Sequence, residues 1–199
     1  MTFNEHVTVY GERPITELCM VLMTPEDICD FIEAIQLTDG TKLLATRSKC
    51  SMPFFSEMYV EAPLGKKYGT VDILCANDEM CLLCEVKPRG YRFIKDRLDP
   101  QIGRYAEAIA DTRTNFRSEL VKEVRGLMSD RKVYLISVTD DDKPPSDLID
   151  CLNIASSRGS CSVGWAPYSI FRLILERHRF KFKGRSAHIW AKHSREGSS

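Results

Sequence analysis

Three ionisable residues stand inside two apolar, β-rich runs, where packing alone favours apolar side chains. Asp72 lies in TVDILC, and Glu85 and Lys87 lie in LLCEVKP. Charged side chains are rarely buried unless they are paired or have a function. Two carboxylates and a lysine could bind a divalent cation and stabilise the charge that develops when a phosphate ester is hydrolysed. These three residues are therefore the first candidates for chemistry.

The segment between the two runs predicts a tight hairpin that brings the three side chains together. Residues 77–79 read Asn-Asp-Glu, which is turn-forming sequence. If residues 78 and 79 form the turn, Asp72 faces Glu85 on the neighbouring antiparallel strand. Residues two apart on a strand share a face, so Lys87 projects from the same side as Glu85. We expect the two carboxylates and the ammonium group to converge.

Two opposed carboxylates repel each other unless positive charge lies between them. Mg²⁺ or Mn²⁺ fits best, because both prefer oxygen ligands, and Asp72, Glu85 and the Val86 carbonyl would supply them. Such an ion could polarise a phosphoryl oxygen and activate water. Lys87 would orient that water or stabilise the transition state. The alternative is a partly buried ion network with a structural role only.

The order and spacing of these residues resemble the PD-(D/E)xK nuclease superfamily, whose signature is an aspartate on one core strand and E-x-K on the next. Here they read G-T-V-D, ending at Asp72, and E-V-K at residues 85–87. Val71 stands where the name-giving proline would be. The resemblance covers about residues 55–110. It implies an α/β fold with a restriction-endonuclease-like core, in which helices flank a mixed central β-sheet.

RecB-type and phage-exonuclease-like members also carry Q-x-x-x-Y in the following helix, which Gln101 and Tyr105 match. Residues four apart lie on one helical face, where the amide and the phenol could hold water or a substrate phosphate. A surface pair satisfied by solvent is the alternative. The resemblance thus implies five catalytic residues, namely Asp72, Glu85, Lys87, Gln101 and Tyr105.

Superfamily members usually add one more acidic metal ligand upstream. Glu33, Glu57 and Glu61 are the candidates here. A strand paired with that of Asp72 could bring Glu61 near the metal, whereas Glu57 fits if a helix ends there. Glu57 is the preferred ligand, and a solvated carboxylate is the alternative for each of the three.

A basic, aromatic loop follows Lys87, with the sequence PRGYRFIKDR. Interleaved cations and aromatic rings suit phosphates and stacked bases, although a solvated loop needs no function. Residues 172–196 are also basic, which fits either a solvated tail or a phosphate-binding surface. The residues expected to bind nucleic acid are Arg89, Arg92, Lys95 and Arg104.

Composition excludes several other classes of protein. Lys plus Arg and Asp plus Glu balance at 28 each, so the net charge points to no partner. The eight scattered cysteines are expected to be reduced thiols. Cys81 and Cys84 form a C-x-x-C, but on a strand they point to opposite faces, which disfavours zinc. Without a signal-peptide pattern or a long apolar run, a soluble, cytoplasmic protein without a membrane partner is expected.

The periodicity of apolar residues and the positions of turn-forming residues predict an α/β protein. The expected order is helices, a meander of strands, and then helix, strand, helix and strand. Thr24-Pro25 marks the boundary between two helices within residues 15–36. Asp99-Pro100 caps another helix. After Tyr168 the pattern fits helix or strand. One domain, 1–199, is expected, with an N-terminal helical part (1–54), a nuclease-like core (55–175) and a basic C-terminal segment (176–199). The other predicted segments are strands at 58–64, 70–77, 80–87, 132–140 and 161–168, and helices at 116–128 and 147–156.

The expected function is metal-dependent hydrolysis of phosphodiester bonds in nucleic acid, with DNA preferred over RNA as the partner. A nuclease-fold protein that binds nucleic acid or a protein without cutting is the alternative. Lys87→Ala is expected to abolish cleavage while leaving the fold intact. The sequence leaves the oligomeric state open, and a homo-oligomer is compatible with it.

Overall fold

The computed structural model describes residues 23–43, 55–87, 91–111 and 116–178 of this 199-residue chain. The first of the two helices expected within residues 15–36 falls mainly outside these ranges. The strands are β1 (Gln36–Leu37), β2 (Glu57–Gly65), β3 (Gly69–Ala76), β4 (Met80–Val86), β5 (Lys132–Thr139) and β6 (Ser162–Pro167). The helices are α2 (Pro25–Ala34), α3 (Pro100–Ala110), α4 (Glu119–Gly126), α5 (Ser146–Gly159) and α6 (Ser169–Arg177).

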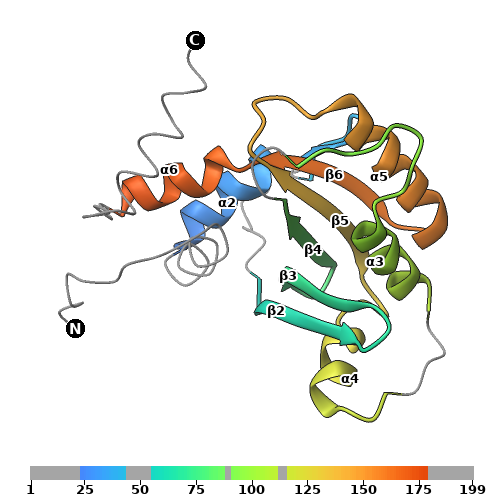
Figure 1. Ribbon diagram of the computed structural model, residues 1–199. Coiled ribbons are helices and arrows are strands. Elements are labelled where there is room, and N and C mark those ends of the chain that lie inside the picture. Colours follow the sequence, from blue (N-terminus) through green and yellow to red (C-terminus); the bar gives the residue numbers. More distant parts are fainter. Residues whose placement is uncertain (1–22, 44–54, 88–90, 112–115, 179–199) are drawn as a thin grey trace, which may run out of the picture.

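The strands form one mixed, open sheet in the order β1-β6-β5-β4-β3-β2 (Figure 1). The central strands β4, β5 and β6 are parallel, whereas β1, β2 and β3 pair antiparallel to their neighbours. The parallel connections run through helices, as parallel strands require. The protein is therefore α/β with a six-stranded mixed sheet flanked by helices, as the sequence predicts at this level.

The register of the β3–β4 hairpin is the predicted one. Ile73 pairs with Cys84 and Ala76 pairs with Cys81, and the Asn77 N–H donates to the carbonyl of Met80 across the turn. The ladder ends at Ile73 and Cys84, so the residues at 72 and 85 are the next ones in the same register. This confirms the predicted geometry on which the convergence of the carboxylates depends.

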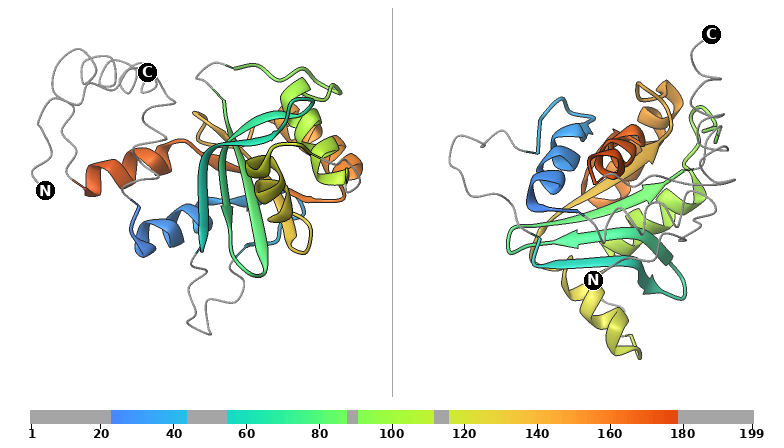
Figure 2. Two further views of the ribbon diagram at one scale, coloured as in Figure 1. Left: turned by 90° about the horizontal axis from the view of Figure 1, so that it is seen from below. Right: turned by 90° about the vertical axis from the view of Figure 1, so that its left-hand side faces the viewer.

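Helices cover both faces of the sheet, which explains why β4 and β5 are apolar along most of their length. α3 and α5 pack on one face, and α2 and α6 lie side by side on the other (Figures 1 and 2). Leu83 and Leu135 belong to the first core, and Leu82 and Ile136 to the second. A charged residue near the end of β4 is therefore buried unless the site opens to solvent.

Two helix starts follow the predicted capping signals. The Thr24 hydroxyl oxygen accepts a hydrogen bond from the Asp27 N–H, and the Asp27 carboxylate accepts one from the Thr24 N–H. This reciprocal pair is a capping box, with which α2 begins. Asp99 caps α3, and Pro100 occupies its first turn. The segment after Tyr168, left open by the sequence, is the helix α6.

The helix predicted to extend to about Gln36 ends two residues earlier. α2 ends at Ala34, and Ile35 is extended. Gln36 then pairs with Trp165 and Leu37 with Gly164, forming the short strand β1. A two-residue strand lacks the alternation that would reveal it in a sequence.

The buried carboxylate of Asp27 on α2 binds residues at the end of α6. Asp27 is fully buried, and besides its Thr24 contacts it accepts from Arg177 Nη1 at 2.8 Å and His178 Nε2 at 2.6 Å. Arg177 Nη2 also lies 2.6 Å from Asp30. Arg177 is therefore paired with two carboxylates of α2. The remaining basic residues of the C-terminal segment, from 179 onwards, lie outside the described ranges.

Asp27→Asn is expected to lower the free energy of unfolding by about 1–3 kcal/mol at pH 7, because charge-assisted hydrogen bonds are lost. Burial alone would raise the pKa of Asp27, but the hydrogen bonds from Thr24 and His178 lower it below its ordinary value. The stabilisation that Asp27 contributes is therefore complete at pH values above the ordinary pKa of an aspartate. It is lost as the pH falls through the lower pKa of Asp27 in the folded protein. Urea unfolding of both proteins at pH 7 and at pH 3 measures this. A difference between them that stays constant with pH would contradict the prediction.

The described cysteines are buried free thiols. Cys81 and Cys84 belong to the cores on opposite faces of the sheet, as strand alternation predicts. Among the described helices, none combines the length and the apolar character needed to cross a membrane.

Candidate active site

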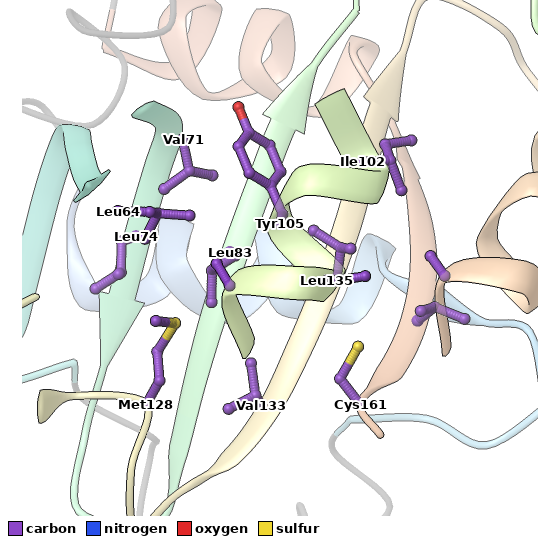
Figure 3. Packing of buried hydrophobic residues seen from close by; sticks show 14 of the residues in the cluster. Leu64, Val71, Leu74, Leu83, Ile102, Tyr105, Met128, Val133, Leu135 and Cys161 are labelled. Carbon is purple, nitrogen blue, oxygen red and sulfur yellow. The ribbon is translucent and has the colours of Figure 1, made fainter. Parts of the chain in front are cut away.

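The five motif residues lie at one end of the sheet, where β4 and β5 end and β3 begins. The carboxyl ends of parallel strands are a common place for ligand sites in α/β sheets. Tyr105 reaches this end of the sheet from α3. Figure 3 shows its ring among Val71 and Leu83, with the hydroxyl pointing away from the other labelled side chains.

Asp72 binds the backbone of β4 directly. Its Oδ2 accepts from the Val86 N–H at 2.8 Å, at the level where the β3–β4 ladder has stopped. The next N–H, of Lys87, donates to the Val138 carbonyl on β5 at 2.8 Å. In a strand, the N–H and C=O of one residue point to the same side. The Val86 carbonyl therefore points towards the Asp72 side of β4, as the predicted metal site requires.

Lys87 is almost fully buried, with 3% of its surface exposed. Its ammonium group lies 3.1 Å from Gln101 Oε1, 3.3 Å from Asp99 Oδ1 and 3.4 Å from Glu85 Oε1. An ammonium has three hydrogens to donate, and three protein oxygens surround it. This burial also changes the expectation for Lys87→Ala, because removing the lysine leaves buried carboxylates without their cation.

Tyr105 joins Glu85 to the rest of the site. Its hydroxyl lies 2.8 Å from Gln101 Nε2, 2.8 Å from Glu85 Oε2 and 2.6 Å from the Thr70 carbonyl. The hydroxyl has one hydrogen, and a backbone carbonyl can only accept. The hydroxyl accepts from the Gln101 amide, and its one hydrogen points towards the Thr70 carbonyl and Glu85, which are both acceptors.

Burial and a neighbouring negative charge favour the neutral form of Glu85. Burial, and next the negative charge of Asp72, raise the pKa of Glu85 to about 7, although Lys87 and Tyr105 act in the opposite direction. Burial and the Glu85 charge likewise raise the pKa of Tyr105 above its ordinary value. Glu85 thus changes charge near neutral pH. Such a shift is common at functional sites, where a neighbouring carboxylate such as Asp72 disfavours a second negative charge.

The structure adds one residue that the sequence indicated only as a helix cap. Asp99 is buried beside Lys87, and its Oδ1 accepts from the Gln101 and Ile102 N–H groups at 2.9 and 3.0 Å. Its Oδ2 accepts a hydrogen bond from the Tyr91 hydroxyl. We name these side chains the acid–lysine cluster, which consists of Asp72, Glu85, Lys87, Asp99, Gln101 and Tyr105.

Glu57, the preferred upstream ligand, is not near Asp72. It pairs with Ala76, four residues along β3, which places it about 13 Å away along the strand. Glu33 is exposed on α2, which covers the opposite face from α3. Glu61 instead lies across from Asp72 in the β2–β3 register, and it adopts a positive φ of 56°. If a third carboxylate is needed, Glu61 is the one that the strand pairing brings to this level.

The basic loop differs from the sequence prediction in what its aromatic rings contact. Tyr91 lies over the Lys87 ammonium at 4.8 Å from the ring centroid and packs edge-to-face on Phe93. Both rings therefore have partners within the protein, and Tyr91 is also exposed to solvent. Arg92 and Lys95 on the loop are exposed, as is Arg104 on α3. Arg89 lies outside the described residues.

Ser137 is a further polar residue at this level of the sheet. It is paired between Glu85 on β4 and Trp165 on β6, and its buried hydroxyl has no hydrogen-bond partner among the residues that the structure describes. Leaving a buried hydroxyl unpaired costs about 1–3 kcal/mol.

Ser137→Ala is therefore expected to leave the free energy of unfolding unchanged or to raise it by up to about 1 kcal/mol. Thermal and urea unfolding at pH 7, with chelator present, measure the change. A loss of more than about 1 kcal/mol would show that the hydroxyl makes a stabilising hydrogen bond.

Asp72 and Glu85 are the two carboxylates that the sequence predicts as ligands of the cation. Within the described part of the chain, no group of three or more His, Cys, Asp or Glu side chains has a geometry that could hold a metal ion. Two carboxylates nevertheless match the usual Mg²⁺ site, in which waters and substrate phosphate complete the coordination. The donor set therefore fits a substrate-assisted Mg²⁺ or Mn²⁺ site better than a closed protein cage.

Comparisons with protein-family models, with curated proteins and with solved structures found no match for this chain.

Proposed function

We propose that this protein is a metal-dependent nuclease of the PD-(D/E)xK type, which hydrolyses phosphodiester bonds at the acid–lysine cluster. The observation that carries the proposal is that Glu85, Lys87, Gln101 and Tyr105 form one largely buried group of hydrogen bonds and ion pairs. Asp72, the fifth motif residue, binds the Val86 N–H on the same strand as Glu85. A chance E-x-K triplet gives no reason for a Q-x-x-x-Y pair from a later helix to reach the same glutamate and lysine.

The fold supports the same proposal. The superfamily signature requires an aspartate on one core strand and E-x-K on the next. Asp72 on β3 and Glu85 on β4 occupy neighbouring antiparallel strands in a mixed sheet flanked by helices. We therefore assign β3, β4 and α3 to a restriction-endonuclease-like core.

The charge of the cluster supports a divalent cation. Asp72, Glu85 and Asp99 contribute three carboxyl groups against the single ammonium of Lys87. We propose that Asp72, Glu85 and the Val86 carbonyl hold Mg²⁺ or Mn²⁺. When bound, the ion polarises a phosphoryl oxygen and makes its bound water more acidic.

The chain's own residues then bind and orient the substrate. Lys87 places a positive charge beside Glu85, where it stabilises negative charge that develops on the phosphate. Gln101 fixes the direction of the Lys87 ammonium through its side-chain oxygen. The exposed cations Arg92, Lys95 and Arg104 contact backbone phosphates outside the cluster. DNA is the expected substrate, and RNA is tested beside it.

The test incubates the purified protein with labelled single- and double-stranded DNA and RNA in Mg²⁺, Mn²⁺ or EDTA. The variants are Asp72→Asn and, as a matched control, Asp78→Asn, an exposed carboxylate in the β3–β4 turn. We expect cleavage of at least one substrate with metal, none in EDTA, and a fall of about 100-fold or more in Asp72→Asn. The control variant should cut like the wild type.

One observation favours a second candidate, a nuclease-fold protein that binds nucleic acid without cutting. The Lys87 ammonium already donates to Asp99 and Gln101 and pairs with Glu85, which reduces its capacity to bind a phosphate. That candidate predicts nucleic-acid binding that is the same in the wild type and in Asp72→Asn, with no cleavage by either protein in any metal.

A further inference from the structure

Asp99 has a position that helix capping alone does not require. A capping carboxylate is usually exposed to solvent, whereas Asp99 is buried and lies 3.3 Å from the Lys87 ammonium. The contact joins residues 12 apart in sequence, across the loop that leads from β4 to α3. Asp99 therefore links the start of α3 to the lysine of the acid–lysine cluster.

Asp99 is itself fixed from three directions. Two N–H groups at the start of α3 bind its Oδ1, and the Tyr91 hydroxyl binds its Oδ2. Its own N–H donates to Cys151 Sγ on α5 at 3.2 Å. A carboxylate oriented by so many contacts offers Lys87 a counter-charge whose position does not depend on the lysine.

The charge of Asp99 favours the same role. Burial alone would raise its pKa, but the hydrogen bonds from Tyr91 and the Ile102 N–H, together with the Lys87 charge, lower that pKa below its ordinary value. Asp99 is thus ionised at neutral pH and pairs with Lys87. The only other carboxylate beside the ammonium in the described structure is Glu85, at 3.4 Å.

We propose that Asp99 is a positioning residue, which holds the Lys87 ammonium beside the reacting phosphate and keeps it from pairing exclusively with Glu85. The inference rests on the proposed nuclease function, because it assigns Glu85 to the cation. Tyr91 completes the arrangement: its hydroxyl orients Asp99, and its ring covers the ammonium.

Asp99→Asn separates this role from helix capping. Asparagine caps helices as well as aspartate does, and it keeps the size of the side chain but removes the charge. Because a charge-assisted hydrogen bond to Lys87 is lost, the melting temperature should fall by about 2–10 °C, and the protein should remain folded at the assay temperature. With the best substrate and metal, kcat should fall about 10- to 100-fold while KM changes less than about 3-fold. Asp147→Asn, in the first turn of α5, is the matched control and should match the wild type in both parameters.

A second readout does not depend on activity. Hydrogen exchange of the Lys87 ammonium can be followed by ¹⁵N NMR of the lysine side chains, with Lys87→Met identifying the signal. Exchange should be at least about 10-fold faster in Asp99→Asn, because a charge-assisted hydrogen bond is lost. Tyr91→Phe keeps the ring but removes the hydroxyl bond to Asp99, and should show a smaller acceleration. This exposed position also provides a test if Asp99→Asn fails to fold.

The outcomes separate the two proposals. No metal-dependent cleavage by the wild type would overturn the proposed function before any variant is compared. Cleavage by the wild type with an unchanged kcat in Asp99→Asn would overturn the positioning role alone. An unchanged ammonium exchange rate in both Asp99→Asn and Tyr91→Phe would also overturn it.

Discussion

Lys87→Met is expected to reduce metal-dependent cleavage by about 100-fold or more in kcat, because it removes the positive charge that stabilises the transition state. Methionine keeps most of the length and apolar volume of the lysine stem, so the loss is mainly one of charge. The same substitution leaves the buried carboxylates without their cation, so the free energy of unfolding should fall by about 3 kcal/mol or more. Steady-state cleavage and urea unfolding measure the two effects.

The matched control is Lys122→Met on α4, a half-exposed lysine whose partner is the exposed Glu119. It should change neither cleavage nor stability by much, since surface ion pairs contribute about 0–1 kcal/mol. If Lys87→Met kept wild-type activity, the catalytic role of Lys87 would be wrong. If it lost stability while the wild-type protein never cut, the acid–lysine cluster would be a structural ion network.

Glu85→Gln is expected to abolish cleavage and yet to stabilise the metal-free protein at pH 8. The folded-state pKa of Glu85 is about 7, above its ordinary value of 4.5. Its protonated form is therefore preferred in the folded state, and stability falls as the pH rises from about 4.5 to 7. Glutamine retains the neutral form at every pH, so the variant should be more stable by about 2 kcal/mol at pH 8 and by much less at pH 5.

Urea unfolding of both proteins in EDTA at pH 5 and pH 8 tests this prediction. The chelator matters because a bound cation would stabilise the wild type selectively. Glu79→Gln in the β3–β4 turn is the control, since that side chain is exposed. A variant less stable than the wild type at pH 8 would mean that Glu85 is ionised and favourably paired in the folded protein.

The sequence could predict the β3–β4 hairpin because the information for it is local. Residues 77–79 form the turn, and the turn fixes every pair along the ladder. The same holds for the start of α3, where Asp99 and Pro100 are adjacent capping signals. Together these elements brought Asp72, Glu85 and Lys87 into one predicted site.

The upstream acid could not be chosen because its position depends on a non-local register. β2 pairs with β3 so that Glu61, and not Glu57, lies opposite Asp72. The positive φ at Glu61 has no signal in the surrounding sequence, since this backbone conformation is uncommon outside glycine. The role of Asp99 beside Lys87 is also non-local, because the contact joins residues 12 apart, one after β4 and one at the start of α3.

The strand β1 was missed for a different reason. Its pairing with β6 requires a close backbone approach at Gly164, where a Cβ atom would lie 2.8 Å from the Gln36 carbonyl oxygen. A glycine inside an apolar strand is the signal that could have indicated this approach. The sequence alone does not show which segment makes it.

The measurement that tests the central claim most directly is a time course of substrate cleavage by the wild-type protein in Mn²⁺, then in excess EDTA, and then after Mn²⁺ is restored. A metal-dependent site at Asp72 and Glu85 predicts cleavage that stops with the chelator and resumes with the metal. Cleavage that continues in EDTA, or no cleavage of DNA or RNA under any of the three conditions, would contradict the account.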